Sequence, residues 1–247
     1  MGDNPVNLQV LFQTLNGEGY KLSGTKTYVP DGQVADVIVV VARTAGERDD
    51  TSGLSLFLVE RESAGVSTQR RIMADSRNMA EVHLDGATGE LLGTAGEAWP
   101  ITDKVIGRAH AVLTAEMLGS AQAAFERTME YLKTREQFGA LIGTFQALQH
   151  RAAEMFCEIE LSKSSVLKAL EAVDTDAPDL ALCASLAKVQ VSEMLRLVSD
   201  EAIQMHGGIG MTDEYDIGFF MKRIRVAQET FGDTAFHADR LARMRGY

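Results

Sequence analysis

The sequence predicts an α+β protein in which a small antiparallel β-barrel or sandwich, residues 1–97, precedes an up-down four-helix bundle, residues 98–247. Before about residue 100 the apolar residues form short runs divided by polar or glycine-bearing segments, and no useful helical period occurs. After it, apolar residues recur at steps of three, four or seven, which marks one helix face. The period changes within residues 93–100, so the domain boundary is expected there.

Composition and charge set outer limits on function. The 247 residues suffice for one large or two modest domains, and 45% hydrophobic with 24% charged residues is typical of a soluble globular protein. A formal net charge of -11 argues against sequence-independent binding of nucleic acid, which requires a basic face. The N-terminus lacks the features of a signal peptide, and no run approaches the roughly 18 apolar residues of a membrane span. We therefore expect a cytoplasmic protein without a membrane span, and we assign no metal site. Cys157 and Cys183 lie in apolar helical patterns, which predicts buried, reduced thiols.

The strands are expected in the first hundred residues. The segment 16–19, Asn-Gly-Glu-Gly, predicts a hairpin turn between strands at 8–15 and 20–29, because asparagine and glycine tolerate positive φ. The run 36–42 is largely β-branched, which predicts a strand buried on both faces. Three more short strands are expected at residues 54–59, 66–71 and 80–84.

The helices follow from the apolar period. One long helix ends in the polar segment 133–139, and a second restarts at Phe145 and runs antiparallel to it as far as residue 173. A third is expected from Pro178, with Asp176 as N-cap, to the pair Gly207-Gly208. A fourth covers 217–230, and a last short helix covers 234–244. In local terms, Gly139 would cap the first helix and Arg135 would complement its dipole.

The order of several motifs resembles the middle and C-terminal domains of the acyl-CoA dehydrogenase family of flavoenzymes. Each motif alone is weak, but their order and spacing over nearly the whole chain make the resemblance specific. The motifs are Gly24 to Val29, Gly93 to Trp99, Arg135-x-x-Phe138-Gly139, Phe145-Gln146, and Gln204-x-x-Gly207-Gly208-x-Gly210 followed by Glu214-Tyr215.

The resemblance implies an FAD site shared between subunits. It places Arg135 against the FAD diphosphate of a neighbouring subunit, a contact that suits a planar guanidinium. It places Phe138 beside the adenosine part, with Phe145 and Gln146 approaching from the next helix, and it assigns Gln204, Gly207 and Gly208 to the segment where backbone comes close to the cofactor. Tyr28 and Val29 fall in the flavin-facing β segment. Pro30 stands where many members have a threonine that donates to the flavin, so that donor is absent. Arg108 is the candidate contact to CoA.

The catalytic residues stay unknown. The family removes the α-proton with a glutamate, which in most members precedes a glycine at the position of Phe231, and in others lies on the first C-terminal helix at the position of Ala109. Neither residue accepts a proton. Glu229, Asp233 and His110 are weak substitutes, and the histidines His110 and His206 are interpreted chiefly as packing or capping residues.

The resemblance implies α,β-desaturation of a CoA thioester in fatty acid or lipid catabolism, with an electron-transfer flavoprotein as acceptor, in a homo-oligomer or a heteromer. Two alternatives remain open: a non-catalytic subunit that completes another subunit's FAD site, and a flavin oxidase or monooxygenase. The family's N-terminal helical domain has no counterpart in this sequence. A fragment, a misplaced start or one half of a heteromeric enzyme would each explain that. The acyl chain also remains open.

Overall fold

The computed structural model describes residues 19–247 and divides the chain into two compact units, Met1–Val105 and Ile106–Tyr247. The strand expected at 8–15 and most of the turn at 16–19 lie outside the described residues.

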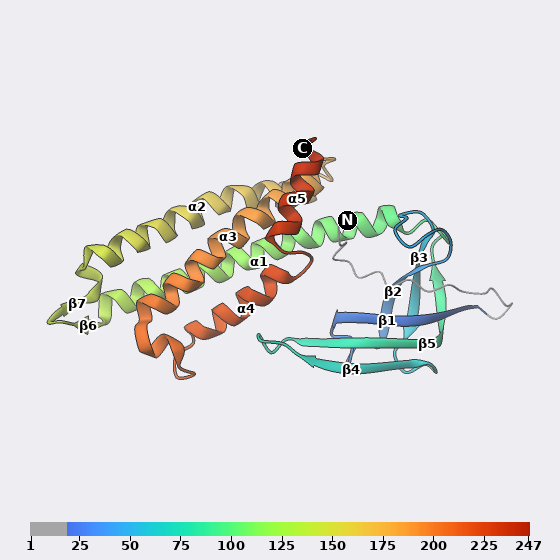
Figure 1. Cartoon of the computed structure of the whole chain (residues 1–247), viewed down its shortest axis with the longest axis horizontal. Helices are drawn as coiled ribbons and strands as arrows, with labels where there is room; N and C mark the ends of the chain where they lie inside the picture. The colour runs from blue at the N-terminus through green and yellow to red at the C-terminus, as the bar shows by residue number, and fades with distance from the viewer. Residues whose placement is uncertain (1–18) are drawn as a thin grey trace. The chain divides into compact units, whose positions relative to one another are not determined.

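The first unit is a curled antiparallel sheet (Figure 1). Its strands are β1 (Tyr20–Pro30), β2 (Val37–Arg43), β3 (Leu54–Glu60), β4 (Val66–Ile72) and β5 (Asn78–Leu92). The hydrogen-bonded order is β1-β5-β3-β2, and β4 also pairs with β5. The fold class is as the sequence predicts. β5 is much longer than the expected strand at 80–84, because β1 and β3 supply ladder bonds to its glycine-bearing second half, while β4 pairs with its first half.

The prediction that the second strand is buried on both faces is wrong. Ile38 and Val40 are buried, whereas Val37 and Val39 are 50% and 59% exposed. The strand pairs only with β3, so it forms an edge, and its side chains alternate between the core and the opposite face as in other antiparallel sheets. The core of this unit includes Leu22, Phe57, Val59, Val82 and Ala87.

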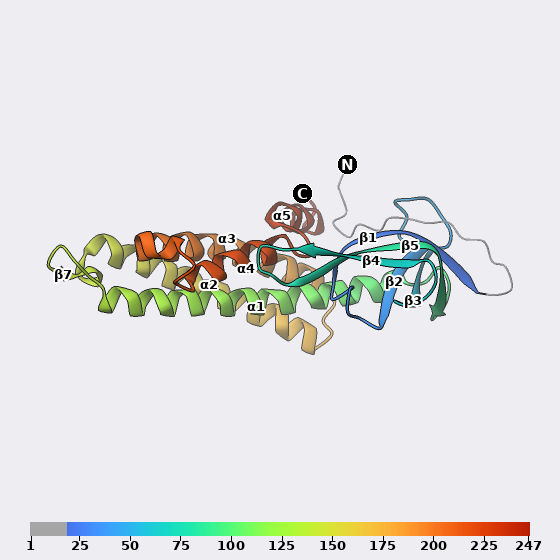
Figure 2. The same ribbon diagram turned by 90° about the horizontal axis from the view of Figure 1, so that it is seen from below.

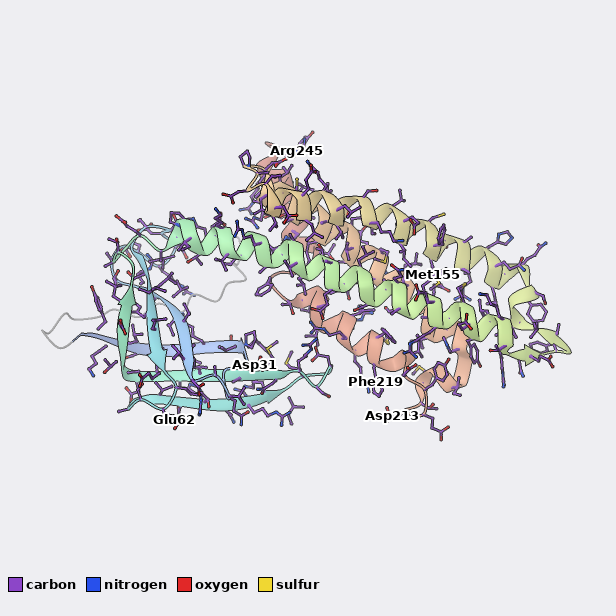
Figure 3. All side chains as sticks on the ribbon, turned by 180° about the vertical axis from the view of Figure 1, so that it is seen from behind. Asp31, Glu62, Met155, Asp213, Phe219 and Arg245 are labelled. Atoms are coloured by element: carbon purple, nitrogen blue, oxygen red, sulfur yellow. The ribbon has the colours of Figure 1, made fainter. Side chains whose placement is uncertain are left out.

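The second unit is a bundle of long helices (Figures 1 and 2). Its elements are α1 (Trp99–Thr134, which begins in the first unit), β6 (Glu136–Gln137), β7 (Ala140–Leu141), η1 (Ile142–Thr144), α2 (Gln146–Asp174), α3 (Leu180–His206), η2 (Gly207–Met211), α4 (Ile217–Glu229) and α5 (Thr234–Met244). Apolar side chains from α1 to α4 form its main core, and Met155 of that core lies between α1 and α2 (Figure 3). The helices expected at 217–230 and 234–244 are present almost as predicted.

Two local expectations fail. α3 begins at Leu180 instead of Pro178, and Asp176 does not cap it: this residue has φ 51° and its carboxylate pairs with Arg108 at 3.3 Å. Cys157 is exposed, although Cys183 is buried as predicted. The helical period alone does not distinguish a residue on the margin of an apolar face from one inside it. Within residues 19–247, no helix combines the length and apolar character needed to cross a membrane.

Candidate functional site

The corner between α1 and α2 is a two-residue β-hairpin. β6 pairs with β7, and the two residues between them, Phe138 and Gly139, have φ of 55° and 76°. Positive φ at both central residues defines a type I′ turn. α1 ends at Thr134, five residues earlier, so Gly139 serves the hairpin and is not the helix cap considered above.

The hairpin holds an aromatic ring away from the body of the unit. Phe138 is 94% exposed, and a bulky side chain at positive φ is strained. Its ring lies edge-on to Phe145, with centroids 6.3 Å apart, at the residue that precedes α2. Gln146, the first residue of α2, is exposed beside it. A strained, exposed aromatic residue is a candidate for ligand contact.

Arg135 precedes the hairpin, and its backbone is hydrogen-bonded on both sides. Its N–H donates to the carbonyl of Tyr131 and its carbonyl accepts from the N–H of Ile142, both at 2.9 Å. Within residues 19–247 the structure shows no ion pair or hydrogen bond of its exposed guanidinium, whereas nearby Lys133 lies 3.9 Å from Glu130. The planar guanidinium of Arg135 is therefore available to bind an anion.

The glycine motif follows the end of α3. Gly207 has φ 63°, and its N–H donates to the carbonyl of Gln204, which closes the last turn. A Cβ at Gly207 or Gly208 would meet no described atom within 4 Å. Gly207 is explained by its backbone conformation, but nothing in the described chain requires glycine at Gly208. Gln204 and both glycines are exposed.

An aromatic cluster joins these two segments. Tyr131, on the last turn of α1, stacks on His206, the last residue of α3, with ring centroids 4.4 Å apart. Tyr215 packs against both rings, 6.0 Å from Tyr131 and 4.8 Å from His206. The hairpin that follows Tyr131 and the glycines that follow His206 consequently lie at the same end of the bundle (Figure 1).

His206 carries an unsatisfied buried atom at this end. Its Nδ1–H donates to the Ala202 carbonyl at 2.7 Å, so Nε2 is left as an acceptor, and it has no hydrogen-bond partner among the described residues. Burial lowers the pKa of this imidazole and keeps it neutral. Buried polar atoms are usually paired, so Nε2 is an exception within the described chain.

In the first unit, Tyr28 and Val29 lie at an irregularity of β1. The register with β5 shifts between Lys26 and Val29, and Tyr28 has φ 53° with 63% of its surface exposed. Val29 packs against the sheet core instead. The irregularity therefore turns Tyr28 outward and Val29 inward, and β1 ends at Pro30.

The position of the expected base, Phe231, lies in the turn between α4 and α5. Phe231 has φ 60° and is 42% exposed, and Gly232 follows at φ 106°. Ala109, the alternative position, is half-buried on α1. Of the two carboxylates that flank this turn in the sequence, Glu229 is exposed, and Asp233 caps α5 by accepting the N–H of Phe236 at 2.8 Å.

Two residues beside this turn were not identified from the sequence. Lys188 and His237 are both fully buried and bond to its carbonyls, as does His110. Lys188 falls on the apolar face of α3 that carries Ala184, Val191 and Leu195. A lysine at a core position is unusual, and this could have identified Lys188 from the sequence. Arg108, the expected CoA contact, pairs with Asp176 at 3.3 Å and remains half-exposed.

Comparison with known proteins decides the family. The model of the acyl-CoA dehydrogenase C-terminal domain matches residues 96–245, and that of the acyl-CoA dehydrogenase middle domain matches residues 1–87. The chain belongs to the acyl-CoA dehydrogenase family. The resemblance of its motifs is thereby confirmed.

Relatives of this chain are known in sequence and structure. A Bacillus subtilis protein named "Probable acyl-CoA dehydrogenase YngJ" is 31% identical over 219 residues, which cover 86% of this chain and 57% of the relative. An acyl-CoA dehydrogenase structure from Geobacillus kaustophilus matches 100% of this chain and 66% of its own, with TM-score 0.92 and 28% identity. A structure described as a Tcur3481-Tcur3483 steroid ACAD variant matches 95% of this chain and 62% of its own, with TM-score 0.81 and 32% identity. The chain spans a little over half the length of the curated relatives that it matches.

Proposed function

We propose that this chain is a subunit of an FAD-dependent acyl-CoA dehydrogenase that desaturates the α,β bond of a CoA thioester. The observation that supports this most directly is the gathering of Arg135, Phe138, Gln204 and the Gly207-Gly208 pair at one end of the bundle, connected by the stack of Tyr131 on His206. These segments are about seventy residues apart in the sequence. Contacts within the described chain explain neither the exposed guanidinium of Arg135 nor the choice of glycine at Gly208.

The residues at this end fit a dinucleotide. The free guanidinium of Arg135 would hold the diphosphate through two parallel hydrogen bonds. Phe138 and Phe145 would cover an apolar ring, with Gln146 as a polar neighbour, and the bare backbone at Gly208 would allow close approach. Because Arg135, Phe138 and Gly208 are exposed at this end of the bundle, the FAD that they hold would extend to a neighbouring subunit.

The desaturation removes two hydrogens from the substrate, one as a proton and one as a hydride. The α-hydrogen leaves as a proton to a base and the β-hydrogen leaves as a hydride, so that a carbon–carbon double bond forms and the thioester is oxidised by two electrons. Bound FAD supplies the hydride acceptor, and an electron-transfer flavoprotein would reoxidise it. In this chain Tyr28 would flank the flavin with Val29 fixing its backbone, and Arg108 would contact the CoA portion.

A second candidate function is supported by the turn at Phe231. Neither Phe231 nor Ala109 accepts a proton, and the buried imidazoles nearby are committed to backbone carbonyls. A chain of this kind would complete the FAD site of a catalytic partner while its own site lacks a base.

The visible spectrum of the purified chain tests both candidates. A flavin band that bleaches when an acyl-CoA is added supports catalysis by this chain. A colourless protein that acquires FAD only together with a related subunit supports the partner role. A chain that binds no FAD under either condition would refute both. Light scattering adds a check on assembly, since a strict monomer at micromolar concentration would contradict the shared site.

A further inference from the structure

The turn between α4 and α5 is held by an unusual number of buried polar side chains. Within residues 227–232, five backbone carbonyls accept hydrogen bonds from just three side chains. Those side chains come from three different helices: His110 from α1, Lys188 from α3 and His237 from α5. The turn is therefore fixed by the bundle around it more than by its own sequence.

Lys188 binds four of these carbonyls. Its Nζ lies 2.9 Å from the oxygen of Ala227, 3.0 Å from Gln228, 2.9 Å from Thr230 and 3.1 Å from Gly232. An ammonium has three protons for these four acceptors, so one proton is shared. The first two acceptors are carbonyls of the last turn of α4, which carries the negative end of the helix dipole. Lys188 thus caps α4 from a neighbouring helix.

Two imidazoles bind the remaining carbonyl. Nε2 of His110 and Nε2 of His237 lie 3.0 Å and 3.1 Å from the oxygen of Phe231. A carbonyl only accepts, so both rings must carry a proton on Nε2. Nδ1 of His237 in turn accepts from the hydroxyl of Ser185 at 3.4 Å. Burial is the main cause that lowers the pKa of His110 to about 3 and of His237 to about 4, so both rings are neutral donors near neutral pH.

These bonds retain a strained backbone. Phe231 has φ 60°, which a bulky residue adopts only when its surroundings overdetermine it, and a Cβ at the next residue, Gly232, would lie 2.5 Å from the ring of Phe236. The carbonyl of Phe231 faces the buried imidazoles, while its side chain is 42% exposed. The arrangement presents one side chain at a fixed place outside a rigid turn.

We propose that Lys188, His110 and His237 are positioning residues for the side chain at position 231, so that a carboxylate placed there would act as the proton acceptor of the desaturation. The proposal rests on the proposed function, because a carboxylate at position 231 has a role only if a CoA thioester binds there with its α-hydrogen toward it. A helix cap that served stability alone would require neither two imidazoles on one carbonyl nor an exposed aromatic residue at positive φ.

The first test needs no cofactor. Amide hydrogen exchange is measured by mass spectrometry on the whole chain and on Lys188→Met, with Val198→Ala as a control that removes core methyl groups from the same helix. Lys188→Met should speed exchange of residues 226–233 at least tenfold while amides of α2 keep their protection, and Val198→Ala should show no such preference. Equal acceleration throughout the bundle would overturn the positioning role. If Lys188→Met does not fold, His110→Gln and His237→Gln are measured in the same way.

The second test adds the chemistry. Phe231→Glu, with Phe231→Gln as a matched control without a base, is loaded with FAD and mixed with butyryl-CoA, and the rate of flavin bleaching is recorded. Phe231→Glu should react about 100-fold or more faster than Phe231→Gln. Adding Lys188→Met to Phe231→Glu should lower kcat at least tenfold with KM unchanged, since the substrate still binds but the carboxylate is misplaced.

The outcomes separate the two claims. If Phe231→Glu holds FAD but bleaches no faster than Phe231→Gln, the positioning proposal fails and the family function stands. The proposal also fails if Lys188→Met has no effect on kcat. If no variant binds FAD, alone or with a related subunit, the proposed function is refuted, and the positioning proposal fails with it because position 231 then has no substrate to face.

Discussion

Tyr131 and His206 stack with their ring centroids 4.4 Å apart, although these two residues are more than seventy positions apart in the sequence. Arg135 is one helical turn beyond the first ring, and Gly207 directly follows the second. This contact turns two separate sequence motifs into neighbours at one end of the bundle.

Arg135→Ala should weaken FAD binding about 10- to 100-fold. A hydrogen bond to a charged group contributes about 1.5–3 kcal/mol, and this guanidinium makes no intramolecular pair among the described residues that the substitution would also break. Titration of the apoprotein with FAD, followed by flavin fluorescence, measures the change. Lys133→Ala is the control, because it removes a positive charge two residues away and should change affinity little. Equal affinity of Arg135→Ala and the parent would remove the main support for the cofactor site.

Gly208→Ala should separate cofactor binding from stability. A Cβ there meets nothing within 4 Å, so the free energy of unfolding should change by less than about 0.5 kcal/mol. If FAD approaches this backbone, the methyl group should weaken its binding about tenfold or more. Thermal unfolding and FAD titration of the same preparation give both numbers. A variant with unchanged affinity would show that the glycine serves another purpose.

Gly232→Ala should destabilise the second unit by about 3 kcal/mol. The added Cβ would lie 2.5 Å from the ring of Phe236 and 3.2 Å from Nε2 of His237, at a φ of 106° that other residues rarely adopt. Gly119→Ala is the matched control, since Gly119 lies exposed within α1 with nothing within 4 Å of a Cβ, and it should gain about 0.5–1 kcal/mol. Urea denaturation checks both. Comparable stability of the two variants would show that the packing around Gly232 relaxes easily.

Stability should fall as the pH is lowered from 7 to 5. His110 and His237 have folded-state pKa values of about 3 and about 4, below the 6.5 of an unfolded chain. The unfolded state therefore takes up protons first. The stability due to each neutral ring is complete above pH 6.5 and is lost progressively toward the folded-state pKa, by up to about 2 kcal/mol per ring at pH 5. Urea denaturation at each pH measures this. His110→Gln and His237→Gln keep a donor but cannot be protonated, so each should flatten the curve, and a flat curve for the parent would contradict the buried neutral imidazoles.

The sequence determined the elements of this protein and the identity of its ligand-contact candidates. Alternating apolar runs before residue 100 and a 3.6-residue period after it indicated the sheet and the long helices, because each pattern reflects a single buried face. Arg135, Phe138, Gln204 and the glycine pair could be named because the order of their motifs resembles the acyl-CoA dehydrogenase family.

Only the tertiary structure decided which side chains and backbone groups surround those residues. The hairpin at Phe138, the exposed side chains of the edge strand β2 and the start of α3 at Leu180 depend on pairing and packing between segments, which a local pattern does not contain. The same holds for Lys188, whose partners lie about forty residues further along the chain. A buried ammonium is stable only where several carbonyls converge, and convergence is a property of folded helices, not of neighbouring residues in a sequence.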